Sequence, residues 1–209
     1  MKRAILLSTL ALLIATTAAA APLGVSSGRD LDALLARARA LPDFAQHDAV
    51  LLCDARATTV TAGGDLATRT HQVVWIATRS GLQAYADQRV PWRAGASSLA
   101  VLKLRTWRDG GWWPDAPPIS PTAVVETLPY AVEHAADYAD LRETMLLHDG
   151  VELPCLLETE YEIVEPGGAQ AGADGLWIFA RRDPALLSEL SLCVPTGVAV
   201  RPPARRRAP

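Results

Sequence analysis

An alternation of acidic and apolar residues in the second half of the chain constrains its fold more than any other feature. It runs from Pro154 to Val164. One set of alternate residues is Leu157, Thr159, Tyr161 and Ile163, and the other is Glu158, Glu160 and Glu162. Successive side chains of a β-strand point to opposite faces of a sheet, so this period of two predicts a strand with one buried face and one face in water.

Other segments repeat this period and predict a β-rich chain. Ala49–Ala62 and Leu66–Ala77 flank Gly63-Gly64-Asp65, a sequence that tolerates the positive φ angles of a tight hairpin turn. Further strands are predicted at Leu99–Arg108, which runs into a second turn signal at Asp109-Gly110-Gly111, and at Leu141–His148, Leu176–Arg181 and Leu186–Val194. Turn signals between strands, without alternating helices, predict an all-β fold, mainly an antiparallel β-sandwich.

Two short helices and one long connection complete the predicted architecture. Asp30 can cap a short N-terminal helix that ends at Pro42 and carries apolar residues at helical spacing. These apolar residues are Leu31, Leu34, Leu35, Ala38 and Leu41. Arg79–Asp87 predicts one or two helical turns. Five prolines between Pro114 and Asp140 allow no long element, so this segment is predicted to be a crossing loop.

The N-terminus predicts a secretory signal. Lys2 and Arg3 precede an uncharged apolar run, Ala4–Ile14, and small residues follow at Thr16–Ala21. The apolar run is shorter than the about 20 residues that a membrane helix needs. Cleavage is predicted after Ala20, which would place the mature protein in the periplasm or outside the cell.

The chain is therefore divided into four segments. Residues 1–20 form the predicted signal, 21–47 an N-terminal segment with the short helix, 48–197 the β-sandwich domain and 198–209 a tail rich in proline and arginine. Removal of the signal would leave 189 of the 209 residues. That length is enough for one domain with a sizeable core.

The charge balance argues against a nucleic-acid partner. The predicted signal holds two of the 20 basic residues, so 18 remain against 23 acidic residues, a net charge of −5. Four of those 18 are arginines in the last nine residues, which leaves a body with a net charge of −9. Nucleic-acid binding depends on clustered lysine and arginine, and an acidic body does not supply them.

The cysteines Cys53, Cys155 and Cys193 all lie in strand-like runs among apolar residues. Free cysteine is among the most buried residue types, so all three are interpreted as small core residues. A cysteine nucleophile needs an accessible thiolate beside a histidine, and Cys155 near His148 is the one alternative of this kind. If the last three strands form a meander, Cys155 and Cys193 lie about 10 Å apart, too far for a disulfide.

The sequence carries no motif for a metal, a cofactor or general acid-base catalysis. The histidines show no HxH or HxxxH spacing, and they are His47, His71, His134 and His148. The row Glu158, Glu160 and Glu162 is interpreted as a solvated sheet face. A Gly-rich phosphate loop and a GxSxG elbow are both missing. We therefore expect no cofactor, no metal and no enzymatic activity.

Four tryptophans are the candidate binding residues: Trp92, Trp107, Trp112 and Trp113. The last two follow a Gly-Gly turn directly, and adjacent residues of a strand point to opposite faces. Exposed tryptophans stack on sugar rings or lie in protein interfaces. The alternative is that most of the four close one end of the sandwich core.

Three further motifs are Tyr138-Ala139-Asp140-Leu141-Arg142, Gly150-Val151-Glu152 and Glu158-Thr159-Glu160-Tyr161. They resemble those of domain of unknown function 3857, an all-β domain that precedes transglutaminase-like domains in secreted bacterial proteins. Together with Asp48–Ile76, the similarity extends from about Asp48 to Gly197. Two departures are Leu153-Pro154-Cys155, where proline, glycine and serine are usual, and the lack of a following transglutaminase-like domain. The resemblance implies a β-sandwich without an established activity.

The expected function is that of an exported, non-catalytic module that binds another protein, in the setting of a transglutaminase-like protein. The alternative is a cell-envelope module that binds glycans or peptides through the four tryptophans. Pro202 and Pro203 cannot continue a central strand, because proline donates no ladder hydrogen bond. A sheet edge is then left open, and we expect self-association or a partner that adds a strand there.

Overall fold

The structure is a computed structural model that describes residues 31–113, 119–129, 140–168 and 182–197. The predicted signal at 1–20, the predicted strand Leu176–Arg181 and the tail at 198–209 lie outside the described residues. His134 also lies outside them. Within the described part, no helix is both long and apolar enough to cross a membrane.

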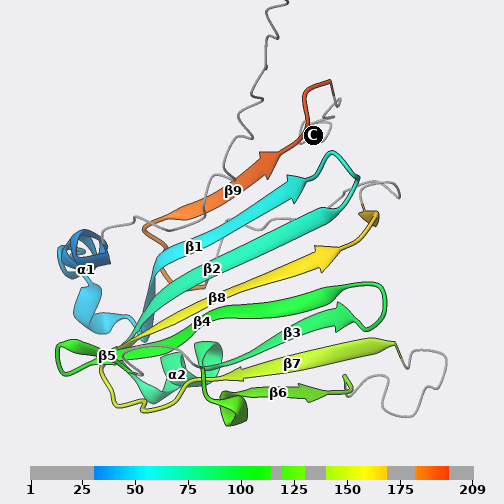
Figure 1. Cartoon of the computed structure of the whole chain (residues 1–209). Helices are drawn as coiled ribbons and strands as arrows, with labels where there is room; N and C mark the ends of the chain where they lie inside the picture. The colour runs from blue at the N-terminus through cyan, green and yellow to red at the C-terminus, as the bar shows by residue number, and fades with distance from the viewer. Residues whose placement is uncertain (1–30, 114–118, 130–139, 169–181, 198–209) are drawn as a thin grey trace, which may run out of the picture.

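A large twisted sheet forms the body of the protein (Figure 1). Its strand order is β5-β4-β8-β2-β1-β9. The bounds are β1 Ala49–Val60, β2 Leu66–Ile76, β4 Ser98–Arg108, β5 Gly111–Trp113, β8 Cys155–Glu165 and β9 Ser188–Cys193. Every neighbouring pair is antiparallel except β1 and β9, which run parallel. The two hairpins predicted from glycine-rich turns are confirmed, with Gly64 and Gly110 at positive φ.

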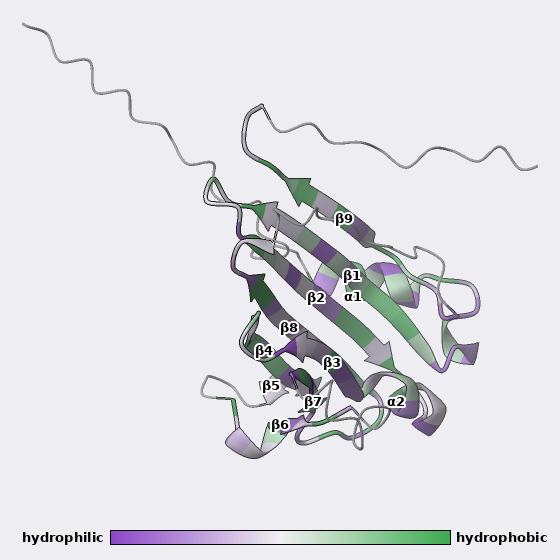
Figure 2. Ribbon diagram, turned by 90° about the vertical axis from the view of Figure 1, so that its right-hand side faces the viewer, coloured by the Kyte–Doolittle hydropathy of each residue, from purple (hydrophilic) through white to green (hydrophobic). Residues whose placement is uncertain are grey.

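A second, smaller sheet has the order β3-β7-β6. Its strands are β3 Asp87–Arg93, β7 Leu141–Leu147 and β6 Val124–Thr127. Val90 and Leu146 pack against Leu104 of β4 and, with it, against Tyr161 and Ile163 of β8. Figure 2 shows the small sheet at the β4 and β8 side of the large sheet, away from β9. The predicted all-β fold with two sheets is confirmed.

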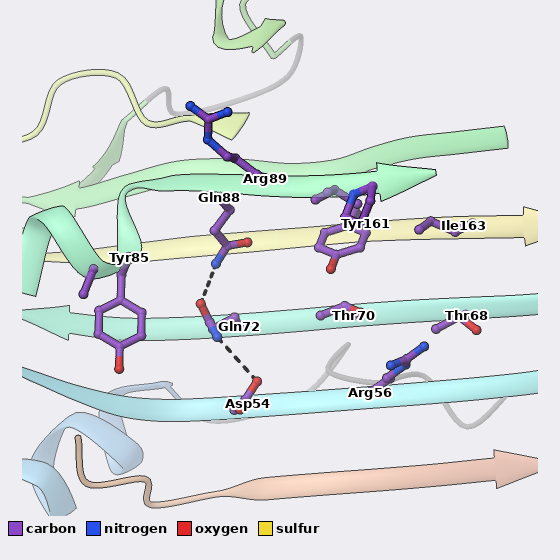
Figure 3. A pocket seen from close by; sticks show the side chains of 13 residues that line it. Asp54, Arg56, Thr68, Thr70, Gln72, Tyr85, Gln88, Arg89, Tyr161 and Ile163 are labelled. Atoms are coloured by element: carbon purple, nitrogen blue, oxygen red, sulfur yellow. Dashed lines mark hydrogen bonds between the residues drawn. The ribbon is translucent and has the colours of Figure 1, made fainter. Parts of the chain in front are cut away.

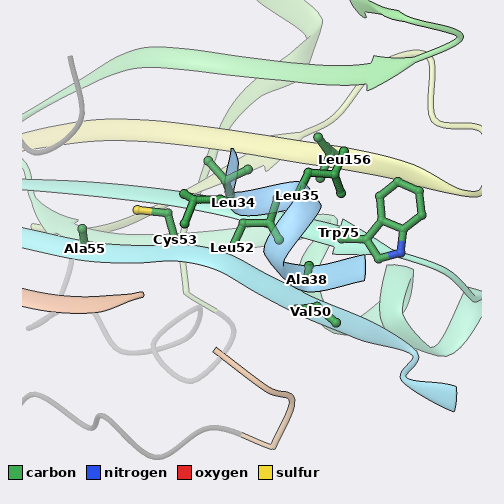
Figure 4. Close-up of a cluster of buried hydrophobic side chains, with 10 residues drawn as sticks. Leu34, Leu35, Ala38, Val50, Leu52, Cys53, Ala55, Trp75 and Leu156 are labelled. Atoms are coloured by element: carbon green, nitrogen blue, oxygen red, sulfur yellow. The ribbon is translucent and has the colours of Figure 1, made fainter. Parts of the chain in front are cut away.

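The opposite face of the large sheet carries the helix α1, Leu31–Arg39. Its buried residues Leu34, Leu35 and Ala38 pack on a cluster that includes Val50, Leu52, Trp75 and Leu156 (Figure 4). Phe44 of the 3-10 turn Phe44–Gln46 stacks on Trp75 with ring centroids 5.8 Å apart. We call this face the helix side and the face toward the small sheet the sandwich side.

A short helix, α2, links the large sheet to the small one. It runs from Arg79 to Tyr85, between β2 and β3. The Thr78 hydroxyl caps its N-terminus by accepting a hydrogen bond from the Gly81 N–H at 3.3 Å. The helical turns predicted at Arg79–Asp87 are thus confirmed, but Asp87 begins β3, a strand that the sequence did not predict.

The acidic row on β8 does not form a solvated face, which corrects the sequence interpretation. Glu158 and Glu160 are 1% and 0% exposed. They are buried because β2 and β4 flank β8 and place cations over them, from Arg69 on one side and from Lys103 and Arg105 on the other. Alternation identified the strand correctly but could not reveal these partners.

Two other expectations need correction. The segment predicted as a crossing loop contains the 3-10 turn Pro121–Ala123 and the strand β6. The last strand does not form a meander with β8. Instead β9 pairs with β1, so Cys193 lies opposite Thr59 and is separated from β8 by both β1 and β2.

Candidate binding groove

The small sheet covers only part of the large one and leaves a groove of about 480 Å³ on the sandwich side (Figure 3). Strand β3 forms one wall of this groove. A hydrogen bond holds the wall to the floor, since Gln88 Nε2 of β3 donates to Gln72 Oε1 of β2 at 2.5 Å. The floor belongs to β1, β2 and β8. Within the described part of the chain, no strand pairs with the outer edge of β3.

The register of the large sheet arranges the floor in rows that cross the strands. In the central row Arg56 of β1 lies opposite Thr70 of β2, and Thr70 lies opposite Tyr161 of β8. Leu190 of β9 extends this row beyond Arg56. Paired residues share one face of a sheet. A guanidinium, two hydroxyls and an exposed leucine therefore stand in line across four strands.

A second row is polar, and it lies two residues away along each strand. It pairs Asp54 with Gln72 and Gln72 with Thr159. Gln72 Nε2 donates to Asp54 Oδ1 at 3.4 Å and its carbonyl accepts from Gln88, so one chain of hydrogen bonds joins floor and wall. Asp54 is only 2% exposed. This chain orients both amides toward the groove (Figure 3).

The third row is less polar. It pairs Thr58 with Thr68 and Thr68 with Ile163. The two threonine hydroxyls lie 3.4 Å apart, and Leu192 of β9 stands beside Thr58. Leu190 and Leu192 are 47% and 49% exposed, so the rim of the groove at β9 is apolar.

Arg56 differs from the other arginines of the sheet. Within the described structure its guanidinium has no hydrogen bond and no ion pair, and the same holds for the hydroxyls of Thr70 and Tyr161. Arg89, on the wall, is paired with Glu143 at 2.7 Å. In Figure 3 Arg56 reaches from β1 along the floor, and the Tyr161 ring points its oxygen toward β2.

The helix side holds a buried cluster of charges. Glu158 accepts from Arg105 Nε at 2.5 Å and lies 3.2 Å from Lys103 Nζ, and Glu160 lies 2.6 Å from Arg69 and 3.1 Å from Lys103. Burial alone would raise the pKa of Glu158. Hydrogen bonds from His71 and Arg105 and the charges of Arg105 and Lys103 outweigh it and lower that pKa to about 2. Burial would also raise the pKa of Glu160, but the hydrogen bond and charge of Lys103, with His71 and Arg69, lower it.

The cluster also brings a thiol, an imidazole and a carboxylate into line, which sequence spacing did not reveal. Cys53 Sγ lies 3.9 Å from His71 Nδ1, and His71 Nε2 lies 2.8 Å from Glu158 Oε1. Nucleophile, base and orienting group follow this order in cysteine hydrolases. Here all three side chains are at most 1% exposed, so the sulfur is closed to a substrate in this structure. The register of β1, β2 and β8 puts all three residues on the helix side, and no sequence signal showed that these strands are neighbours.

The remaining cysteines are free thiols. Cys155 is fully buried, as interpreted from sequence, whereas Cys193 is only half-buried. Burial raises the pKa of the Cys155 thiol to about 11. Its neighbour in sequence, His148, uses Nε2 to contact Thr159 Oγ1 at 2.9 Å, and burial lowers the pKa of His148 to about 4. The thiol and the imidazole are therefore both neutral at pH 7.

We expect Cys155 to react slowly with iodoacetamide in the folded protein at neutral pH, because the thiolate is scarce and closed to reagent. Cys193 should be labelled faster under the same conditions. Mass spectrometry of peptides after timed labelling measures both rates, and unfolding in urea should make them similar. Rapid labelling of native Cys155 would reveal an activated nucleophile.

The four candidate tryptophans do not form one site. Trp107 and Trp112 are cross-strand partners on the helix side, and the Arg105 guanidinium lies 4.0 Å from the centroid of Trp112. Trp113 is 51% exposed on the other face of the same hairpin, beside Gly150. Trp92 belongs to the small sheet, where its indole donates to Thr144 Oγ1 at 2.9 Å. Only Trp107 and Trp112 are brought together.

Potential metal ligands do not gather in the described residues: no group of three or more His, Cys, Asp or Glu side chains could hold an ion. Among the described residues, the groove floor presents the Arg56 guanidinium and the Thr70 and Tyr161 hydroxyls without partners. These groups are suited to hydrogen bonding rather than to bond cleavage.

Fold and groove together define a two-sheet β domain in which, over the described residues, the small sheet covers only part of the large one. Residues 62–206 match the family DUF3857, described as a "Domain of Unknown Function with solved-structure structure". The match extends over more than half of the chain, so the protein belongs to this family. No curated protein sequence matches.

Among solved structures, the chain is similar to a crystal structure described as a "putative protease" from Parabacteroides distasonis ATCC 8503. The TM-score is 0.60 at 21% sequence identity, and this likeness shows the fold alone. The match covers 72% of this chain but only 29% of that chain. In that protein the fold thus accounts for a minor part of a longer polypeptide.

Proposed function

We propose that this protein is an exported, non-catalytic accessory module that binds an extended segment of a partner protein in the groove beside β3. The observation that carries the proposal is the incomplete second layer of the described structure. There, three strands stand over a six-stranded sheet, and the floor that they leave open is rich in hydrogen-bonding groups. An added strand at β3 would continue the small sheet over β2 and β1. Strand addition of this kind takes affinity from main-chain bonds and specificity from alternate side chains.

The composition of β3 supports its role as a receiving edge. Pro91 stands within it, and proline occurs on edge strands with its missing N–H on the side away from the neighbour. The outer edge therefore offers fewer main-chain donors than an ordinary strand. Binding must then depend strongly on the floor side chains, which favours a selective partner over indiscriminate strand pairing.

The partner setting that we propose is a transglutaminase-like protein of the cell envelope. Its support is the resemblance described above and the likeness to part of a longer chain described as a "putative protease". Export rests on the charged and apolar pattern at Lys2–Ile14. The buried position of Cys53 supports an accessory role rather than a catalytic one.

Panning a displayed library of short random peptides against the purified full chain tests the groove. We expect selected peptides to lose at least about tenfold in affinity for Thr70→Trp, whose indole would fill the floor. Thr59→Trp is the matched control, because Thr59 lies on the helix side of β1, and should bind like the unaltered chain. Equal binding to both variants would place the peptides elsewhere and refute the proposal.

A glycan-binding module is the second candidate, and the exposed ring of Trp113 favours it. The Arg108 guanidinium lies 5.6 Å from the centroid of that ring. Exposed tryptophans stack on sugar rings. A glycan array that detects binding by the full chain, lost on Trp113→Ala but kept on Thr70→Trp, would favour this function over the groove.

The edge at β9 predicts weak self-association. The described structure pairs β9 only with β1, so the other edge of β9 has no neighbouring strand. Leu190 and Leu192, on the sandwich side of β9, are about half exposed. Open apolar edges invite a second chain. We expect static light scattering to show an apparent mass that rises with concentration across the micromolar range. Replacing both leucines with lysine should abolish the rise, and a concentration-independent monomer mass for the unaltered chain would contradict the prediction.

A further inference from the structure

The groove has a recognition chemistry of its own, and the inference drawn from it rests on the proposed function. We infer that the central row selects a carboxylate, carried by an acidic residue of the bound segment. Arg56 carries the positive charge of this row, and Thr70 and Tyr161 stand next to it in register. Neither the guanidinium nor the two hydroxyls have a partner within the described structure.

A carboxylate matches these groups better than a neutral side chain does. A guanidinium presents two parallel N–H donors at the spacing of two carboxylate oxygens, and such charge-assisted pairs are the stronger hydrogen bonds of proteins. The other described cations of these strands already have partners. Arg69, Lys103 and Arg105 are engaged with Glu158 and Glu160 on the helix side, and Arg108 is paired with Glu152. Arg56 is therefore the cation that the sheet keeps available in the groove.

The rows on either side of Arg56 predict the neighbouring residues of the ligand. Side chains of an added strand that point to the floor recur every two residues, about 7 Å apart. The rows of the floor are also two residues apart along β1 and β2. Successive floor-facing side chains of the ligand therefore lie over successive rows. One neighbour of the acidic residue then lies over Asp54 and Gln72, and the other lies over Thr58 and Ile163.

These two environments differ in polarity. In the row of Asp54 and Gln72, the Gln72 side-chain amide is held in place by Asp54 and Gln88, and such an oriented amide suits a hydroxyl, amide or amino group. The row of Thr58 and Ile163 continues to the exposed Leu192, which suits an apolar side chain. The preferred segment is thus polar, acidic and apolar at alternate positions, read from the Asp54 end of the groove to the Leu192 end.

Peptides that lose affinity for Thr70→Trp provide the probes. Each peptide is made with every acidic residue changed singly to its amide, and with the C-terminus either free or amidated. We expect one Glu→Gln or Asp→Asn change to weaken binding about tenfold or more, with the amidated peptides unaffected. Loss only on C-terminal amidation would assign the carboxylate to the chain end instead of a side chain and overturn the acidic-residue assignment.

Variants of the protein then identify the partner of that carboxylate. Arg56→Gln should remove the difference between the acidic and amide peptides, and Arg56→Glu should reverse it in favour of a lysine-substituted peptide. Arg93→Gln is the matched control, because Arg93 is an exposed arginine of β3 that does not line this groove. It should retain the full preference.

The outcomes separate this inference from the proposed function. Peptides that bind in the groove without any acidic preference, or a preference that survives Arg56→Gln, would overturn the inference and leave the proposed function standing. A library that yields no groove binder would overturn both. Circular dichroism melting of each variant verifies that a lost preference does not come from unfolding.

Discussion

Replacing Glu158 with glutamine should lower the free energy of unfolding by about 3 kcal/mol. The carboxylate is 1% exposed and lies within 3.2 Å of atoms from His71, Lys103 and Arg105. Removing its charge leaves these groups facing an amide and each other. Removing one partner of a buried ion cluster is costly, because the remaining charged groups are left buried without an opposite charge. Lys103 and Arg105 reach solvent in part, which limits the loss.

Chemical denaturation with urea measures this change, and Glu162→Gln is the matched control. Glu162 lies on the same strand and the same side, between Ala100 of β4 and Arg69 of β2. It forms no ion pair in the described structure, because Arg69 is paired with Glu160. Its substitution should change stability by no more than about 0.5 kcal/mol. Equal effects of the two substitutions would show that the cluster does not stabilise the fold.

The pH dependence of stability provides a second test of the same cluster. The pKa of Glu158 falls from 4.5 to about 2 on folding. A lowered carboxyl pKa stabilises the folded state at pH values above the unfolded pKa, and this stabilisation is lost as the pH falls through the folded pKa. The unaltered protein should therefore lose about 3 kcal/mol between about pH 5 and pH 2. Glu158→Gln should lose less over that interval, since it has no carboxyl to protonate.

Burial of the acidic row could not be inferred from its alternation, because its partners come from elsewhere in the chain. Arg69 and Glu160 are 91 residues apart, and His71 and Glu158 are 87 apart. A period of two establishes which residues share a face of the strand. It does not show what lies over that face, since this depends on which strands become neighbours and in which register.

Features encoded locally were predicted well. Both glycine-rich hairpins and α2 have their signals within a few residues, at Gly63-Gly64-Asp65, Asp109-Gly110-Gly111 and Thr78–Tyr85. Strand β3 was missed because Val90 is its only buried residue and Pro91 interrupts the pattern. Its half-exposed composition is that of an edge strand.

The groove follows from long-range arrangement and had no sequence signal as a site. Arg56, Thr70 and Tyr161 come from three strands, and only the register of the sheet puts them in one row. The tryptophans were selected for their residue type alone. In the structure one lies in the small sheet, and the other three are divided between the two faces of the β4–β5 hairpin. In this protein, polar side chains without a hydrogen-bond partner therefore indicate a candidate binding site better than the presence of tryptophans does.

Gly81→Ala should destabilise the protein by about 3 kcal/mol, although alanine is the better helix former by about 1 kcal/mol. A Cβ on Gly81 would lie 2.3 Å from the carbonyl oxygen of Asp48 and 2.9 Å from its carbon, and these backbone atoms cannot rotate away. The same oxygen accepts from the Ala77 N–H at 2.9 Å, and the Thr78 hydroxyl donates to Asp48 Oδ1 at 2.5 Å. Relieving the clash must displace α2 from the start of β1.

That displacement should also disturb binding, because α2 leads directly into the groove wall. Tyr85 ends the helix and Gln88 follows on β3, where it is hydrogen-bonded to Gln72. We therefore expect Gly81→Ala to lower both the urea midpoint and the affinity for groove peptides. Gly63→Ala is the control, since the nearest atom to its Cβ would be Thr61 Oγ1 at 3.7 Å, and it should change stability by less than about 0.5 kcal/mol. A Gly81→Ala protein as stable as the control would mean that α2 does not lie against the backbone of Asp48. The packing of α2 on Asp48 would then not explain why β3 lies beside the groove floor.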